Sequence, residues 1–421
     1  MKKKILLAAA RALGAVTAYL YGRRKKESQE PASPDYKNKI ILSKNIWREQ
    51  ETRKTKINNN FLLIGDSGTV MKHFIIPNIL EQNSSYIVVD PEGKIYEQVK
   101  DKLYGYEIKR LNLSSQSIKG SVPYNPLTYV KTERDVMMIV DCFLSQNGSN
   151  GKFGYNLQKI LLIGCMFHLL ETGKLETGNK LSFKALYDLL DNFSDDLFAS
   201  DPADGHAVKH FRYFKESAAG PAKDAVIDSC ITCLEPFRFW GEEDGCNLEE
   251  LSDRKIALFL IPDAEPNAIA NTFIPMLFAQ LYEIQINTVI PYSSITCFIQ
   301  DEEYLKGFDN EDNISFPKSM IFPTYGVDLV FVTEKISESD YSNHTGINLT
   351  TAANCDSIIY YSSPDLATAE YVSKRIGDEK ISFGKGTRTR RIMTAAELLR
   401  LPKGKCVVIQ ENQRTIIDDV Y

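Results

Sequence analysis

Two short segments of the chain combine residue types that could bind and activate a phosphate. The first is the run Gly65, Asp66, Ser67, Gly68, Thr69, Val70, Met71 and Lys72, between an apolar stretch and a helical pattern. A glycine-containing turn in that place can present backbone N–H groups to phosphate. The second is the acidic pair Asp301-Glu302, which ends the apolar run ITCFIQ. In a nucleotide-hydrolysing fold, carboxylates at a strand end handle the metal and the water.

The glycine turn departs from the pattern of a working phosphate-binding loop, G-x-x-x-x-G-K-[ST]. Counted from Gly65, Val70 replaces the second glycine, Met71 the lysine and Lys72 the hydroxyl residue. A β-branched side chain obstructs the close backbone approach that glycine allows. Lys72 comes one residue late, and one helical step turns a side chain by about 100°. Each lost charge-assisted hydrogen bond is worth roughly 1.5–3 kcal/mol, so we expect weak nucleotide binding.

The elements around these segments alternate between strands and helices. The apolar spacing in MKHFIIPNILEQ predicts a helix after the glycine turn, with Pro77 bounding or kinking it. Between about residues 131 and 250 several segments have helical apolar spacing, and strand-like runs are almost absent. Strands are predicted at 61–64, in the run SSYIVVDPEG, and at 255–262, 293–303, 328–334, 356–362 and 405–411, with a helix at 271–286. This order predicts an α/β sheet domain interrupted by an all-helical domain.

Residues 1–26 differ from the rest of the chain. Lysines at 2–4 precede an apolar stretch from Ile5 to Tyr21, and a basic cluster follows at 23–26. Three interpretations stay open: a short membrane span, a helix on the membrane surface, or a signal-like segment. Arg11 lies mid-stretch and costs about 2.5–3.5 kcal/mol on insertion. We expect a membrane anchor with the following chain on the cytoplasmic face, joined through a linker and lead-in at 27–57.

Cysteines and histidines give no metal-binding pattern. The 8 cysteines are scattered, as in a reduced cytosolic protein. Cys230 and Cys233 form a single CxxC that is expected to be a pair of buried thiols. His206 and His210 could share a helix face, but no acidic or cysteine partner is evident in the sequence, and His168 is expected on a helix, partly buried. No structural metal is predicted.

A basic segment lies near the C-terminal end, in ISFGKGTRTRR. The formal net charge of the chain is -5, so any nucleic-acid contact must be local. Two interpretations stay open: a solvated hairpin, or a loop that contacts DNA phosphates without reading sequence. The DNA-contact candidates are Lys385, Arg388, Arg390 and Arg391, with Lys380 nearby.

Several strings of the sequence, spread over residues 58–421, together resemble the type IV coupling-protein family, the TraG/TraD-type ATPases of bacterial conjugation. In order they are NNFLLIGDSG, YIVVDPEG, YNP at 124–126, AAG at 218–220, ALFLIPD at 257–263, the acidic pair, NCDSIIYY at 354–361, TAEYVSKRIG at 368–377 and MTAAELLRLPKGKCVV at 393–408. The last two are the most specific to the family.

The resemblance implies a RecA-like P-loop NTPase domain at 58–130 and 251–421, interrupted by an all-alpha domain at 131–250. If the site is active, it implies ATP and Mg²⁺ as cofactors, with Asp301 holding Mg²⁺ through water and Glu302 polarising the attacking water; if it is inactive, no cofactor is expected. It also implies a membrane region, a hexamer, and partners among the conjugation machinery and the relaxase–DNA complex. The family's arginine-bearing segment and sensor glutamine have no counterpart here, and the sensor position falls near Thr333 or Glu334.

We therefore weigh three interpretations. The favoured one is a coupling-protein homologue that links DNA or protein substrate to the transfer apparatus without hydrolysing ATP, with an active paralogue as one partner. The alternative is an active DNA-translocating ATPase in which a local backbone shift recruits Lys72. The third is a relic of a mobile element without selected function.

Overall fold

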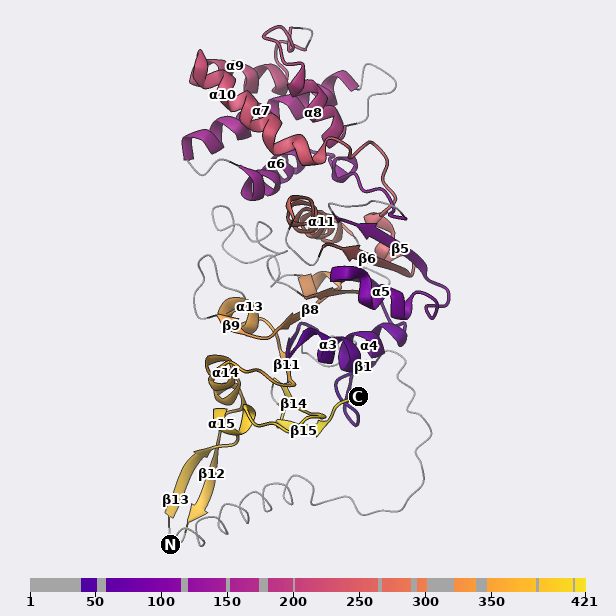
Figure 1. Cartoon of the computed structure of the whole chain (residues 1–421), viewed down its shortest axis with the longest axis vertical. Coiled ribbons are helices and arrows are strands. Elements are labelled where there is room, and N and C mark those ends of the chain that lie inside the picture. Colours follow the sequence, from indigo (N-terminus) through magenta and orange to yellow (C-terminus); the bar gives the residue numbers. More distant parts are fainter. Residues whose placement is uncertain are drawn as a thin grey trace. The chain divides into compact units, whose positions relative to one another are not determined.

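The structure, a computed structural model, describes residues 39–421 except 51–57, 115–119, 149–151, 174–180, 200, 264–266, 289–293, 301–321, 338–346, 384–385 and 412 (Figure 1). The chain divides into two compact units, here called unit 1 (Met1–Asn83 and Val332–Tyr421) and unit 2 (Ser84–Phe331). The predicted anchor at 1–26 lies outside the described residues. Within the described ranges, no helix has the length and apolar character needed to cross a membrane.

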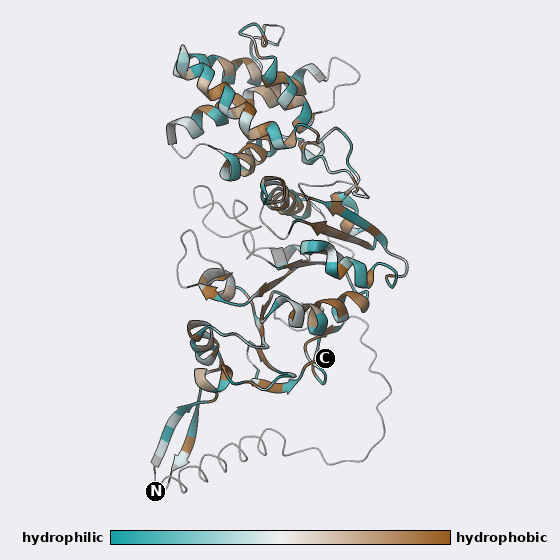
Figure 2. Cartoon of the chain, in the orientation of Figure 1, coloured by the Kyte–Doolittle hydropathy of each residue, from teal (hydrophilic) through white to brown (hydrophobic). Residues whose placement is uncertain are grey.

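Unit 2 contains a parallel sheet in the order β8-β7-β4-β6-β5. All residues of its strands β4 and β6 are buried and most of them are apolar, as expected for a sheet covered on both faces (Figure 2). The strands are β4 (Ser85–Val89), β5 (Glu107–Asn112), β6 (Ile256–Ile261), β7 (Ile295–Ile299) and β8 (Val327–Thr333), and the last two residues of β8 fall in unit 1.

Among the described residues between β5 and β6, five α-helices form one bundle (Figure 1). No strand occurs in the described part of this segment. The first helix begins with a capping box, in which the Thr132 side chain and the Asp135 carboxylate bond each other's backbone N–H. The helices of the bundle are α6 (Glu133–Asn147), α7 (Lys152–Gly173), α8 (Phe183–Asp191), α9 (His206–Ser217) and α10 (Pro221–Leu234). Two further helices connect strands of the sheet: α5 (Lys94–Val99) lies between β4 and β5 in the chain, and α11 (Ala268–Ile286) lies between β6 and β7.

An aromatic cluster joins the bundle to α11. The rings of Phe143, Phe183, Phe237 and Phe273 lie with neighbouring centroids 5.2–5.5 Å apart, and all four side chains are buried. Aromatic pairs at this separation contribute about 0.5–1.5 kcal/mol each beyond the area they bury. The helical segment is therefore packed onto the sheet's own helix.

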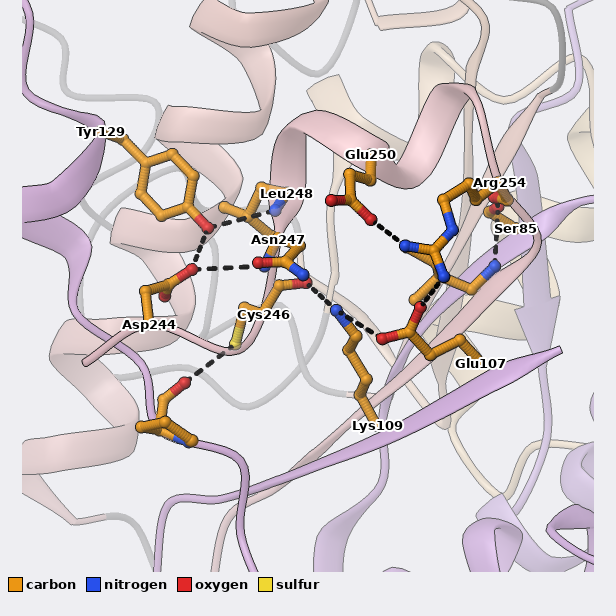
Figure 3. Close-up of polar contacts among 12 residues, drawn as sticks. Ser85, Glu107, Lys109, Tyr129, Asp244, Cys246, Asn247, Leu248, Glu250 and Arg254 are labelled. Atoms are coloured by element: carbon orange, nitrogen blue, oxygen red, sulfur yellow. Dashed lines mark hydrogen bonds and ion pairs between the residues drawn. The ribbon is translucent and has the colours of Figure 1, made fainter.

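A polar network fixes the chain where it returns from the bundle to the sheet (Figure 3). Lys109 on β5 is buried, and its ammonium donates to the Cys246 carbonyl at 3.1 Å and pairs with Glu107 at 3.2 Å. Glu107 also pairs with Arg254 at 2.6 Å, and Arg254 pairs with Glu250. These groups lie at the start of β5, whereas ligands of open parallel sheets bind beyond the carboxyl ends of the strands. We interpret the network as structural.

In the described part of unit 1, strands of the large sheet follow the order β15-β14-β11-β3. Strands β3 (Phe61–Ile64) and β11 (Ser357–Tyr360) are parallel, whereas β14 (Lys405–Gln410) and β15 (Ile416–Asp419) run antiparallel to their neighbours. The smaller elements are β1 (Lys39–Ile41), β2 (Trp47–Glu49), β9 (Ile336–Ser337), β10 (Ile347–Asn348), α13 (Leu349–Ala353), α14 (Leu366–Ile376) and α15 (Ala395–Leu398).

The antiparallel hairpin of β1 and β2 is tied to the end of the sheet by a buried carboxylate. Asp418 accepts from the Ser43 hydroxyl at 2.7 Å, the Asn45 backbone N–H at 2.9 Å and the Asn45 amide at 2.8 Å. Burial raises the pKa of Asp418, but the bonds from Asn45 and Ser43 outweigh it and bring the pKa below the ordinary value. The carboxylate is thus ionised at neutral pH and holds segments more than 370 residues apart.

The predicted strands at 61–64, 255–262, 328–334, 356–362 and 405–411 are confirmed, as is the strand in SSYIVVDPEG. Of the run predicted at 293–303, the described part forms β7. The helix predicted in MKHFIIPNILEQ is confirmed, and it begins earlier than that run, at Ser67. Helix α3 spans Ser67–Val70 and continues through the π-helical turn Met71–Ile75 into α4 (Ile76–Leu80). Pro77 is compatible with the continuing helix because the widened turn just before it changes the backbone bonding pattern.

Candidate functional site

The turn that the sequence nominates for phosphate binding follows β3 directly. The N–H of Gly65 donates to the Thr333 carbonyl at 2.9 Å, and the N–H of Tyr361 donates to the Ile64 carbonyl at 2.8 Å. A Cβ placed on Gly65 would lie 3.0 Å from the Cβ of Tyr361 and 3.5 Å from a methyl of Val70. Glycine is therefore required here by packing against the neighbouring strand end.

We expect Gly65→Ala to lower the free energy of unfolding by about 1–3 kcal/mol, because the added methyl overpacks against Tyr361. Gly68→Ala is the matched control. Gly68 lies inside α3, and its Cβ would meet no atom closer than the Asp66 carboxylate at 3.4 Å. Alanine in a helix is favoured over glycine by about 0.5–1 kcal/mol, so this control should be neutral or stabilising. Urea denaturation of both variants measures the difference, and equal effects would contradict this account of Gly65.

Asp66 is the N-cap of α3. Its carboxylate accepts from the Thr69 backbone N–H at 2.9 Å, and its carbonyl accepts from the Val70 N–H at 3.0 Å. The helix therefore begins at Ser67, and only Gly65 and Asp66 separate it from β3. In the working pattern, by contrast, several loop residues precede the second glycine and aim their N–H groups at the phosphates.

The charge at this helix start is already negative. Hydrogen bonds from Thr69 lower the pKa of Asp66 below its ordinary value. An ionised carboxylate at a helix N-terminus is favourable because the helix dipole and the unsatisfied N–H groups attract anions. For the same reason it competes with a phosphate for those groups and repels it.

The three altered positions of the loop pattern do not restore a phosphate site. Val70 is fully buried, so it packs inward, where a working loop needs glycine. Met71 and Lys72 lie in the π-helical turn, and the Lys72 side chain is exposed. Of the candidates Gly65, Asp66, Ser67, Gly68, Thr69 and Lys72, four are helical and one is the helix cap.

The residues at the expected sensor position, Thr333 and Glu334, take part in hydrogen bonds to the backbone. The Thr333 hydroxyl donates to the Lys335 carbonyl at 2.6 Å, and the Ser363 hydroxyl donates to the Glu334 carbonyl at 2.7 Å. These bonds close the turn after β8. The predicted Mg²⁺ ligand Asp301 and the predicted water-polarising Glu302 lie outside the described residues.

Three of the four predicted DNA-contact residues lie on one strand. Arg388, Arg390 and Arg391 belong to β13 (Gly386–Arg391), which pairs with β12 (Asp378–Phe383). Arg391 pairs with Asp378 at 3.0 Å, and Arg390 pairs with Glu379 at 2.9 Å. Lys385 lies outside the described residues. Contact with DNA by these residues stays a prediction.

The acidic turn in YIVVDPEG has a structural role that the sequence did not reveal. Both carboxylate oxygens of Asp90 accept helix N–H groups, from Ile95 at 3.0 Å and Tyr96 at 2.7 Å, and so cap α5. Burial raises the pKa of Asp90, and the bonds from these N–H groups offset part of that rise.

The histidines of the helical bundle have acidic neighbours. His168 is buried on α7, and its Nδ1 lies 2.7 Å from an Asp201 oxygen. His206 stacks on Phe167 with centroids 4.7 Å apart, and its Nδ1 lies 3.5 Å from a Glu133 oxygen. The sequence shows no acidic partner for His206, because Glu133 on α6 lies far away along the chain and is brought close only by the fold. Across the described ranges, no three His, Cys, Asp or Glu side chains converge to hold a metal.

The CxxC cysteines are thiols at the end of α10. Cys230 is fully buried and Cys233 partly buried, and burial raises the pKa of both. The Cys233 thiol donates to the Asn147 carbonyl at 2.7 Å. Because a raised pKa disfavours the reactive thiolate, this pair suits packing rather than redox chemistry.

A mostly parallel sheet with a glycine turn between β3 and the following helix is compatible with a RecA-like, P-loop NTPase-like fold. Residues 36–183 match a family model described as type IV secretory system conjugative DNA transfer. The predicted resemblance to type IV coupling proteins is confirmed by this match. No curated protein matches the chain in sequence.

Solved structures of two proteins share the fold. The bacterial conjugative coupling protein TrwB, in a form with sulphate, has a TM-score of 0.66 at 12% identity, covering 97% of this chain and 92% of that chain. The same protein in complex with ADP and Mg²⁺ has a TM-score of 0.65 at 12% identity, covering 96% and 90%. VirB4 of Thermoanaerobacter pseudethanolicus has a TM-score of 0.54 at 11% identity, covering 94% and 98%. At these identities the likeness defines the fold.

Proposed function

We propose that this chain is a coupling-protein homologue of conjugative DNA transfer that connects substrate to the transfer apparatus without hydrolysing ATP itself. The family match over residues 36–183 supports the conjugative role. One observation carries the second half of the proposal: Asp66 caps a helix that begins at Ser67.

The physical argument concerns the groups that grip a triphosphate. The loop pattern supplies backbone N–H groups, a lysine for the terminal phosphates and a hydroxyl for Mg²⁺. Here the Thr69 N–H is bonded to the Asp66 carboxylate, and methionine and lysine stand at the last two positions. Losing two or more charge-assisted bonds at roughly 1.5–3 kcal/mol each weakens binding by about 100-fold or more.

Solved relatives show what the intact fold can hold. TrwB forms complexes with ADP and Mg²⁺ and with a non-hydrolysable ATP analogue. If this chain were active, ATP and Mg²⁺ would bind at the turn that contains Asp66. Asp301 would then hold Mg²⁺ through water and Glu302 would activate water.

The proposed partners follow from the same role. They are the conjugation machinery, the relaxase–DNA complex and an active paralogue that supplies the hydrolysis, within a homo- or hetero-hexamer. The proposed location is the cytoplasmic face of the cell membrane, held by the basic and apolar segment 1–26. That segment lies outside the described residues, so its anchoring is part of the proposal.

Isothermal titration of the full chain with ATP and Mg²⁺ tests the proposal. We expect no binding heat up to millimolar nucleotide. We also expect no ATPase activity that depends on Glu302, so that the unaltered chain and Glu302→Gln give the same background rate. The alternative, an active motor that recruits Lys72, predicts micromolar affinity that Lys72→Ala removes. That result would refute the proposal and establish the alternative.

A further inference from the structure

A tryptophan is exposed on the antiparallel hairpin of β1 and β2, the first described elements after the predicted anchor. Of the chain's two tryptophans, Trp240 is half-buried against the Phe273 ring at a centroid distance of 4.6 Å, whereas Trp47 is 44% exposed. The Lys39 ammonium lies 3.7 Å from the centroid of the Trp47 ring. The exposed feature is therefore an aromatic ring with a cation held over it.

Contacts on the other face and along one edge fix the orientation of this hairpin. Trp47 and Arg48 are neighbours on β2, so their side chains point to opposite faces. Arg48 is buried, and its guanidinium donates to the Ser357 hydroxyl at 2.8 Å. Along the β1 edge, beside α4 (Figure 1), the Asn78 side chain bonds both the N–H and the carbonyl of Ile41, each at 2.9 Å. Trp47 is thus held facing outward.

The exposed charge around Trp47 is mainly positive. The hairpin carries three basic residues and one acid, and Arg48 is the basic residue that is buried. Lys44 in the connecting loop is exposed and Lys39 is half-exposed, whereas the acid, Glu49, is half-buried. The backbone N–H of Lys44 donates to the carbonyl of a β15 residue at 3.0 Å, which holds the loop in place. The hairpin therefore presents a ring and a net positive charge on a rigid support.

Covalent geometry keeps this hairpin close to the predicted anchor. The basic cluster at 23–26 ends the anchor, and residues 27–38 are the chain between that cluster and β1. A linker of this length spans at most roughly 40 Å, so the hairpin cannot leave the neighbourhood of a bilayer that holds the anchor. A short tether gives an effective concentration on the order of millimolar, at which a weak affinity for the surface is sufficient.

The chemistry of the hairpin fits an anionic lipid surface. Tryptophan is favoured at the headgroup level of a bilayer because its ring is largely apolar and its indole N–H is polar. Lysines close to anionic lipids are attracted to the negative surface potential. We propose that the β1–β2 hairpin rests on the anionic membrane surface, with Trp47 at the headgroup level and Lys39 and Lys44 facing lipid phosphates. This rests on the proposed function only for the anchor, and not for the absence of hydrolysis.

The test follows the fluorescence of Trp47 in the full chain carrying Trp240→Phe, which leaves one tryptophan and keeps a ring against Phe273. The protein is reconstituted with vesicles of phosphatidylcholine and phosphatidylserine that contain a lipid with a nitroxide close to its headgroup. We expect the nitroxide to quench Trp47. In Lys39→Gln/Lys44→Gln, the ratio of surface-bound to free hairpin should fall at least about fivefold, because one lysine near an anionic surface contributes about that factor.

The matched control is Lys335→Gln/Lys374→Gln. It removes the same charge from two exposed residues of unit 1 outside the hairpin, so the quenching should be unchanged. An equal loss of quenching in this control, or no loss in Lys39→Gln/Lys44→Gln, would overturn the proposed contact. Thermal melting of each variant checks that the fold is retained.

Sedimentation with the vesicles measures the anchor separately from the hairpin. A chain that sediments with vesicles while its Trp47 is not quenched would overturn the hairpin contact and leave the anchor standing. A chain that does not sediment would refute both the proposed location and the hairpin contact. Trp47 emission that changes with protein concentration, and not with lipid, would assign this face to a second copy of the chain instead. ATPase activity would refute the proposed lack of hydrolysis and leave the hairpin result standing.

Discussion

A chain carrying Asp66→Gly, Val70→Gly, Met71→Lys and Lys72→Thr is expected to bind ATP with Mg²⁺ at least about 100-fold more tightly than the unaltered chain. The four changes recreate the loop pattern from Gly65 onward and remove the carboxylate that caps α3. Glycine at 66 and 70 weakens the first helical turn, which frees backbone N–H groups to face the phosphates. A 100-fold gain corresponds to about 2.7 kcal/mol, the strength of one or two charge-assisted bonds.

The control for this experiment keeps Asp66 and changes only the last three positions. If the Asp66 carboxylate competes with phosphate, this triple variant should gain clearly less affinity than the quadruple variant. Titration calorimetry with ATP and Mg²⁺ measures both, and circular dichroism verifies that the fold survives. Equal affinities for the two variants would show that the Asp66 cap is not what excludes nucleotide. Failure of both to gain affinity would contradict the assignment of this turn as a former phosphate loop.

Asp418→Ala is expected to lower the free energy of unfolding by about 3 kcal/mol. The change removes three hydrogen bonds to an ionised group and leaves the donors of Ser43 and Asn45 without their acceptor. Urea denaturation measures the loss. The matched control is Asp419→Ala on the same strand. Its side chain makes one ion pair with Lys405 at the surface, worth less than about 1 kcal/mol.

The pH dependence of Asp418 has a definite sign. Its folded-state pKa is lowered, so the unfolded chain takes up the proton first as the pH falls. The stability that Asp418 contributes is fully present above the unfolded value, about pH 3.9, and is lost as the pH drops through the folded value. The stability difference between the unaltered chain and Asp418→Ala should be constant from pH 8 to pH 5 and shrink below about pH 4. A difference that grows on acidification would contradict this role.

Much of the fold was predictable from the sequence because its buried strands are short, apolar and well separated. The apolar composition predicts buried strands in FLLI, YIVV and ALFLI. Each of these runs lies in a sheet strand whose residues are all buried. The helical period between residues 131 and 250 was equally clear. The register and order of the strands were not predictable, because they depend on contacts between segments such as β4 and β6, some 170 residues apart.

The candidate site shows the limit of reading a motif one residue at a time. The sequence showed that Val70, Met71 and Lys72 break the loop pattern, but it did not show how the backbone responds. In the structure, helix formation extends back to Ser67 because Asp66 can cap it once the second glycine is gone. The basic segment presents a similar case. Its five basic residues look alike in sequence, and only the cross-strand pairing separates Arg390 and Arg391, which meet acids, from Lys380 and Arg388.

The sequence alone determined the α/β class, the helical insertion and the loss of the phosphate-loop consensus, because local apolar period and residue identity carry that information. Three features were decided by the tertiary structure alone. Gly65 packs against Tyr361, Asp418 joins the N-terminal and C-terminal segments of unit 1, and only some arginines of the basic segment pair with an acidic side chain. Each of these rests on groups that lie far apart in the chain or on opposite strands, and no local pattern encodes such contacts.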